Sequence, residues 1–169
     1  MFDELQASSD PGACSRYFTQ NLLEQASKRR GRAAVLSCEE QVLEDPSPDE
    51  EMTVSGIEVD GGEGTADVAS EGGTFDGQKI RYRLVEQDGA WKVDEMLEFI
   101  VFDRDKLILE MGRSWYRDAR TRAELDAVSC SIDRLLEADD AALQEVFLGR
   151  TMQPLLELVQ ACEPRSAAV

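Results

Sequence analysis

The polar and apolar positions change their period along the chain. Apolar residues recur at helical spacing from about Pro11 to Arg30 and from about Arg32 to Glu44, where Asp45-Pro46-Ser47-Pro48 ends the pattern. The period then becomes two, in five stretches separated by glycine-rich turns: Met52–Val54, Ile57–Val59, Thr65–Ser70, Lys79–Glu86 and Ala90–Phe102. Ser55-Gly56 switches the phase of the apolar positions as a β-bulge does. We therefore expect two helices followed by an antiparallel sheet.

The dipeptide Asp88-Gly89 predicts a two-residue hairpin turn that pairs Gln87 with Ala90. Counting outward from this turn gives a register with one apolar face and one charge-paired face. The pairs expected on the apolar face are Leu84 with Val93, Tyr82 with Glu95 and Ile80 with Leu97, and those on the charged face are Arg83 with Asp94 and Lys79 with Glu98.

The last third of the chain predicts helices again. Asp103 caps one through about Arg120, the capping box Thr121-Arg122-Ala123-Glu124 starts the next, and Asp139 or Asp140 starts a third that Gly149 interrupts. A segment around Pro154 is expected to end near Cys162, with a loose tail from Pro164 to Val169. Apolar stripes on these helices must be buried, so we expect a compact cap docked on the sheet domain: Ile108, Met111 and Trp115; Leu125, Val128 and Ile132; Leu155 and Val159. The predicted domains are residues 1–102 and 103–169.

Four cysteines fall as two local pairs, Cys14 with Cys38 and Cys130 with Cys162. On the first two helices the apolar stripes place Cys14 and Cys38 in one seam, so a disulfide there needs no rearrangement. The second pair is also expected to be bridged, although Cys130 lies off the apolar stripe of its helix. Four free buried thiols in a cytosolic protein are the main alternative; a zinc site lacks both a C-x-x-C motif and any histidine. Disulfides favour an extracytoplasmic protein, with a cytoplasmic one as the alternative.

The charge limits the kinds of partner. The chain has 35 acidic and 18 basic residues, a net charge of −17, which repels phosphate backbones and makes nucleic acid an unfavourable partner. No stretch has the 18 or so apolar residues that span a bilayer. The start Met1-Phe2-Asp3-Glu4 has no signal-peptide pattern, so the extracytoplasmic expectation requires that a leader was removed.

Two helices, then a sheet whose final hairpin contains Asp88-Gly89-Ala90-Trp91-Lys92-Val93, resemble the nuclear-transport-factor-2-like superfamily over about residues 1–102. The resemblance is to small secreted or lipoprotein-type domains of actinobacteria, in which a cysteine in each of the first two helices recurs. It implies an α+β fold: an N-terminal helical hairpin packed on a curved, cone-like antiparallel sheet, followed here by a C-terminal helical extension. Proteins with this fold often dimerise through a sheet face, so a homodimer is one expected assembly.

The fold hosts both enzymes and binding modules, and function must come from the site. The interpretation we favour is a non-catalytic module that holds a small apolar ligand in the cone or binds a protein partner, without metal or cofactor. Candidate ligand-binding residues are Tyr82, Trp91, Glu95, Leu97 and Phe99. The alternative is an isomerase-, dehydratase- or cyclase-like enzyme in which a desolvated Glu95 acts as the base and Tyr82 as the oxyanion donor. The sequence does not decide between the binding module and the enzyme.

Overall fold

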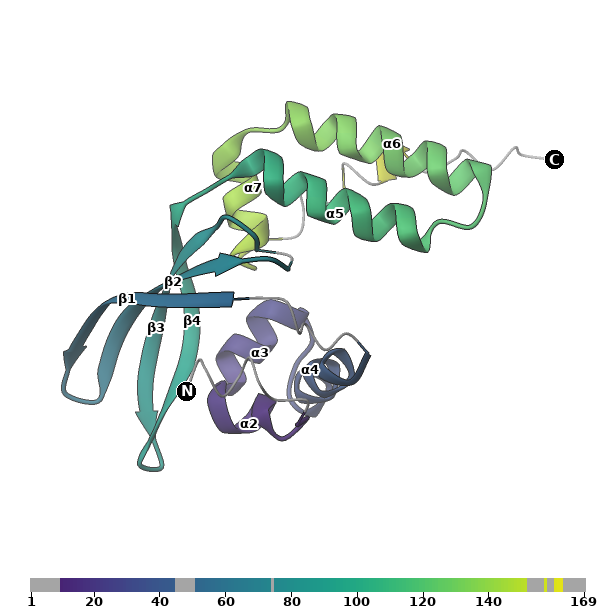
Figure 1. Cartoon of the computed structure of the whole chain (residues 1–169). Helices are drawn as coiled ribbons and strands as arrows, with labels where there is room; N and C mark the ends of the chain where they lie inside the picture. The colour runs from purple at the N-terminus through teal and green to yellow at the C-terminus, as the bar shows by residue number, and fades with distance from the viewer. Residues whose placement is uncertain (1–9, 45–50, 74, 152–156, 158–159, 163–169) are drawn as a thin grey trace. The chain divides into compact units, whose positions relative to one another are not determined.

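The structure is a computed structural model, and it describes residues 10–44, 51–73, 75–151, 157 and 160–162. The chain divides into two compact units, Met1–Phe102 and Asp103–Val169 (Figure 1). Within the described residues, the first unit holds three helices and an open four-stranded antiparallel sheet, and the helices of the second unit follow it in sequence. The fold is therefore α+β, and each unit is described separately.

The N-terminal helices are α2 (Ala13–Tyr17), α3 (Gln20–Ser27) and α4 (Arg32–Glu44). The bounds of α4 are those predicted, but the single helix expected from Pro11 to Arg30 is wrong. Phe18 is extended and forms a parallel bridge with Val93, and the Thr19 N–H donates to the Val93 carbonyl oxygen at 3.0 Å. The Thr19 hydroxyl then accepts from the backbone N–H of Leu22 and caps α3. A contact with a distant strand thus breaks the helix.

The basic run between α3 and α4 contains the turn that separates them. α3 ends at Ser27, and its C-cap residue, Lys28, is left-handed with φ 59°. Gly31, with φ 56°, precedes α4, and its N–H donates to the Glu24 carboxylate at 2.8 Å. A lysine rather than a glycine therefore terminates α3.

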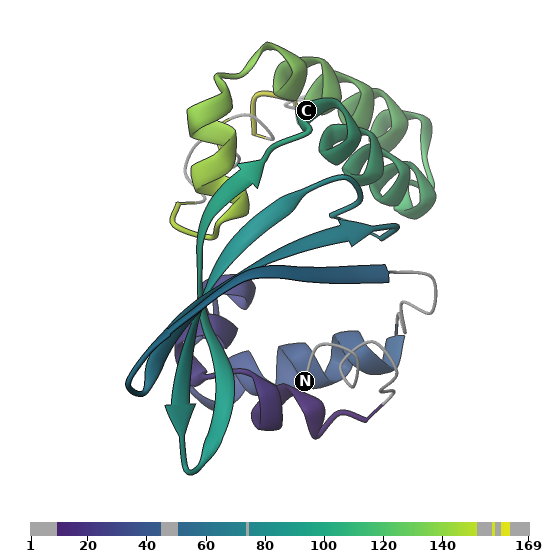
Figure 2. The same ribbon diagram turned by 60° about the vertical axis from the view of Figure 1, so that its left-hand side comes forward.

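The sheet has the order β1-β2-β3-β4, all antiparallel, and Figure 2 shows its strong twist. Its strands are β1 (Glu51–Asp60), β2 (Glu63–Glu71), β3 (Lys79–Gln87) and β4 (Ala90–Val101). The two stretches expected near Ser55-Gly56 are one strand with a register shift between Ser55 and Glu58, as the change of phase predicted. The segment Asp60–Glu63 is the plain hairpin turn of this strand pair.

The β3–β4 hairpin follows the predicted register only near its turn. Gln87 pairs with Ala90 and Leu84 with Val93, as expected, and Asp88 and Gly89 are both left-handed in the turn. Register then shifts three times, because β4 carries extra residues that β3 does not match. The remaining pairs differ from the prediction: Arg83 lies opposite Glu95, Tyr82 opposite Met96, Arg81 opposite Glu98, Ile80 opposite Phe99 and Lys79 opposite Val101.

The helices of the first unit pack together around a small apolar cluster of Leu23, Ala34 and Val35, with Phe18 and Cys38 against it. Cys14 is 1% exposed and forms the predicted disulfide with Cys38. Side chains of α3 reach β4, where Gln25 donates to the Met96 carbonyl oxygen and accepts from the Met96 N–H. These contacts place α3 beside the edge strand β4.

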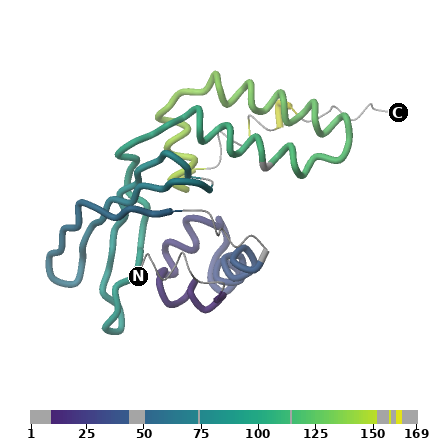
Figure 3. Tube along the Cα trace, viewed as in Figure 1, coloured from purple at the N-terminus to yellow at the C-terminus, as the bar shows by residue number. Residues whose placement is uncertain are grey.

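The second unit contains α5 (Arg104–Asp118), α6 (Arg122–Glu137) and α7 (Asp140–Phe147). The predicted caps are confirmed: Asp103 caps α5, Thr121 and Glu124 form a capping box on α6, and Asp139 caps α7. In the chain trace α5 and α6 lie side by side, joined by a short connection (Figure 3). Gly149, with φ 74°, follows α7 as expected of a helix terminator.

The predicted disulfide Cys130–Cys162 joins α6 to the last described segment. Predictions for Leu155, Val159 and the tail after Cys162 lie outside the described residues, as does the expected helix end at Asp45-Pro46-Ser47-Pro48. Among the helices that the structure describes, none combines the length and hydropathy needed to cross a bilayer.

Candidate functional site

The predicted pairing of Tyr82 with Glu95 is wrong. Because the register shifts beyond Val93, Tyr82 lies opposite Met96 and Glu95 lies opposite Arg83, on the other face of the sheet. The Glu95 carboxylate forms an ion pair with Arg83 at 2.8 Å. The proposed base, Glu95, and the proposed hydroxyl donor, Tyr82, are therefore on opposite faces of the sheet. The cross-strand pairing on which the enzymatic interpretation depended is absent.

The other candidate residues of the hairpin are half-buried. Trp91 and Phe99 lie opposite Glu86 and Ile80 of β3. These two residues are four and two positions from Tyr82, so Trp91 and Phe99 lie on the same face of the sheet as Tyr82. The ring of Phe99 meets that of Phe102 edge to face, with centroids 5.0 Å apart. Leu97 is an extra residue at a register shift of β4. Ligand binding by these side chains stays a prediction.

The opposite face of the sheet carries ion pairs centred on β3. Arg81 bridges two neighbouring strands: its Nε lies 2.7 Å from Asp67 Oδ1 on β2, and its Nη1 lies 3.0 Å from Glu98 Oε1 on β4. Lys79 lies 3.8 Å from the same Asp67 carboxylate. Asp67 is only 6% exposed, and hydrogen bonds from Arg81 lower the pKa of its carboxyl group. This face is charge-compensated, as the alternating sequence predicted.

A second cluster ties α3 to this face. Arg83 Nη2 lies 2.8 Å from Asp94 Oδ2, and the hydroxyl of Thr19 donates to Asp94 Oδ1 at 2.7 Å. Asn21 donates to the Asp94 carbonyl oxygen at 3.0 Å. The expected Arg83–Asp94 contact is therefore an ion pair, although Asp94 is the extra residue at a bulge and not the residue opposite Arg83. All three basic side chains of β3 are held by acidic partners, so this face stabilises the unit.

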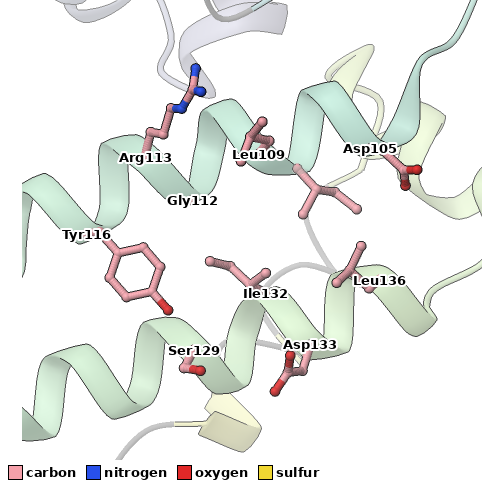
Figure 4. A pocket seen from close by; sticks show the side chains of 10 residues that line it. Asp105, Leu109, Gly112, Arg113, Tyr116, Ser129, Ile132, Asp133 and Leu136 are labelled. Atoms are coloured by element: carbon pink, nitrogen blue, oxygen red, sulfur yellow. The ribbon is translucent and has the colours of Figure 1, made fainter.

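The second unit presents an apolar groove between α5 and α6. Figure 4 shows its lining side chains projecting from both helices. The groove has a volume of about 570 Å³ and ten lining residues. At its floor the two helices approach closely at Gly112, where a Cβ atom would lie 2.8 Å from Cδ1 of Ile132. The absence of a side chain at Gly112 sets how near the helices come.

Three large apolar side chains of this groove are exposed. Leu109 is 53% exposed, Leu136 is 48% exposed and Tyr116 is 44% exposed. Ile108, which also lines the groove, is almost fully buried, as is Leu107. Isolated exposed leucines are common on protein surfaces, but a contiguous apolar group that lines a concavity is typical of a binding surface.

The rim of the groove is charged. Asp105 and Asp133 are exposed, and within the described residues neither carboxylate has an ion-pair partner. Arg113, which also lines the groove, forms an ion pair with Glu110 one turn earlier. The groove therefore offers apolar contact in its interior and uncompensated negative charge at two points of its edge.

Sequence reasoning did not find this groove. The sequence correctly predicted that Ile108 lies on a buried stripe of α5. It predicted a single apolar face for this helix. The available signal was a second stripe, since Leu109 and Tyr116 are seven residues apart and lie on one side of a helix. Leu136 and Ile132, four residues apart on α6, complete it.

Comparisons with protein-family models, with curated proteins and with solved structures find no match to this chain.

Proposed function

We propose that this protein is an extracytoplasmic interaction module that binds an amphipathic helix of another protein in the groove between α5 and α6. The observation that carries the proposal is the exposure of Leu109, Tyr116 and Leu136 around one concavity. Burying these side chains against a partner releases water from apolar surface, which is the main source of affinity in such grooves.

The shape of the groove favours a helical ligand. A groove between two helices accepts a third helix whose apolar side chains recur every three or four residues. A volume of about 570 Å³ holds several such side chains. The free carboxylates of Asp105 and Asp133 favour lysine or arginine beside the apolar row of the ligand.

The extracytoplasmic part of the proposal rests on the two closed disulfides, Cys14–Cys38 and Cys130–Cys162. Cysteine pairs of this kind persist in oxidising compartments and are reduced in most cytosols. Thiol counting tests this part. Protein denatured without reductant should show no reactive thiol, and four after reduction. Reactive thiols before reduction would contradict the proposal.

For the first unit we propose the nuclear-transport-factor-2-like arrangement, with a sheet curved into a cone. Two observations support it: α3 packs beside β4, and β4 carries three register shifts, which bend a strand. A small apolar ligand on the face that holds Tyr82, Trp91 and Phe99 stays a prediction. A crystal structure with a curved sheet enclosing an apolar cavity would support it, and a flat, filled sheet face would contradict it.

Selection from a displayed library of helical peptides, with the oxidised full chain as bait, tests the groove. We expect peptides with apolar residues at helical spacing and flanking basic residues. The double variant L109S/L136S should weaken their binding about tenfold, because two exposed apolar contacts are lost. Leu43→Ser is the matched control, since Leu43 is 65% exposed on α4 in the other unit.

Two results would contradict the groove proposal. Selected peptides could bind L109S/L136S as tightly as the unchanged protein, or the library could yield no peptide whose binding depends on these leucines. Asp105→Asn with Asp133→Asn should weaken basic peptides and leave uncharged ones unaffected, which separates the rim charge from the apolar contact.

A further inference from the structure

β1 is an edge strand of the sheet (Figure 1). It pairs with β2 on one side, and no other strand of the described residues pairs with its second side. From Gly56 to Asp60 every residue is exposed. An edge of this kind presents backbone N–H and C=O groups that can pair with another strand.

The exposed part of β1 carries apolar side chains. Ile57 is 63% exposed and Val59 is 59% exposed, and their spacing of two places them on the same face of the strand. β-branched residues fit best when a neighbouring strand covers them, and natural edges seldom leave them open. The segment of residues 56–60 therefore offers both unpaired backbone groups and exposed apolar side chains to a further strand.

Its charge is entirely negative. Glu51, Glu58 and Asp60 lie on β1, Glu63 and Glu71 lie on β2, and the sequence has no lysine or arginine between Arg32 and Lys79. A second copy paired edge to edge would bring these carboxylates against one another, which is unfavourable. A partner with positive charge would be attracted instead.

We propose that the β1 edge binds an extended segment of another protein in which apolar residues alternate with lysine or arginine. The segment adds a fifth strand through backbone hydrogen bonds. Its apolar side chains cover Ile57 and Val59, and its basic side chains face Glu58 and Asp60. The register shift at Ser55 and Glu58 limits the straight part of this edge to the end near the turn, so a short segment suffices. This surface lies in the first unit and is independent of the groove between α5 and α6.

A fluorescent octapeptide of alternating valine and lysine, titrated with the oxidised full chain at low salt, tests the proposal by anisotropy. We expect binding that weakens about tenfold when every second amide is N-methylated, because the backbone donors are removed. A peptide of the same composition with the lysines grouped at one end should bind more weakly than the alternating one. These comparisons need no protein variant and are unaffected by misfolding.

Protein variants distinguish local binding at the β1 edge from attraction by the net negative charge of the protein. Glu58→Gln with Asp60→Asn should weaken the alternating peptide about fivefold or more, and Ile57→Ser with Val59→Ser should do the same through lost apolar contact. The matched control is Asp118→Asn with Glu137→Gln, which removes two exposed charges on α5 and α6, in the other unit. The control should change binding less than twofold.

Four results would overturn the proposal. Equal binding of the N-methylated peptide, or equal weakening by the control, would show attraction by net charge only. Absence of binding would show that the acidic residues and the bulge only protect the edge. Self-association of the unchanged chain in sedimentation velocity, abolished by Val59→Lys, would make a second copy the occupant.

Discussion

Arg81 holds the buried carboxylate of Asp67 with two hydrogen bonds, Nε to Oδ1 at 2.7 Å and Nη2 to Oδ2 at 3.2 Å. The same guanidinium reaches Glu98, whose side chain is 55% exposed, whereas the side chain of Asp67 is 9% exposed. One cation therefore has a buried and an exposed partner, which allows a direct comparison. Asp67→Ala should lower the free energy of unfolding by about 1–3 kcal/mol, because it removes a buried charged acceptor. Glu98→Ala should cost less than about 0.5 kcal/mol. Urea denaturation of both variants measures this difference, and equal losses would contradict it.

The same pair predicts a pH dependence. Hydrogen bonds from Arg81 lower the pKa of Asp67 below its ordinary value of 3.8. A lowered pKa in the folded state stabilises the protein above that ordinary value, and the contribution disappears as the pH falls through the folded pKa. The stability difference between the unchanged protein and Asp67→Asn should therefore be complete at pH 7 and vanish well below pH 3.8. Denaturation at a series of pH values measures it, and a difference independent of pH would refute this.

Asp94 and Glu95 both contact Arg83, but only Asp94 also accepts a hydrogen bond from Thr19. Asp94→Ala should therefore destabilise the first unit by about 1–2 kcal/mol through loss of the contact with α3. Glu95→Ala should have a smaller effect, because Arg83 retains Asp94. Thermal unfolding monitored by circular dichroism compares the two. A larger effect of Glu95→Ala would assign it a role that these contacts do not explain.

Each disulfide closes a loop within one unit, with sequence separations of 24 and 32 residues. Replacing either cysteine pair by alanine should lower the free energy of unfolding of its unit by about 3–4 kcal/mol, because the unfolded chain is no longer cross-linked. The loss should be local: C14A/C38A should expose amides of α2 and α4 to hydrogen exchange, and C130A/C162A those of α6. Faster exchange in the other unit would contradict this assignment.

Gly112 and Ile132 should be energetically coupled. Gly112→Ala gains helix propensity of up to about 1 kcal/mol, but its methyl group would displace Cδ1 of Ile132, 2.8 Å from the added atom. Ile132→Val lacks that atom, so Gly112→Ala should be more favourable in the valine background. A double-mutant cycle by urea denaturation measures the coupling, for which we expect about 0.5–1 kcal/mol. Additive effects would show that Ile132 moves aside without cost.

The sequence by itself determined the features whose physics is local. The capping box of Thr121 and Glu124, the helix Arg32–Glu44 and the Asp88-Gly89 turn each depend on neighbouring residues, and so could be read from spacing. The Cys14–Cys38 disulfide was also predicted from apolar stripes, and it forms although the helix that carries Cys14 ends at Tyr17.

Only the tertiary structure decided the register of β4 and the end of α2. The bulge at Asp94 lies where Thr19 and Asn21, more than seventy residues earlier, bond to its side chain and carbonyl oxygen. The Phe18 bridge to Val93 breaks the first helix at the same place. Counting outward from a turn assumes that each residue of β3 lies opposite a single residue of β4. Contacts from a distant helix favour an extra residue in β4, and such counting cannot include it. That extra residue moved Glu95 away from Tyr82, which is why the two side chains do not form the predicted pair.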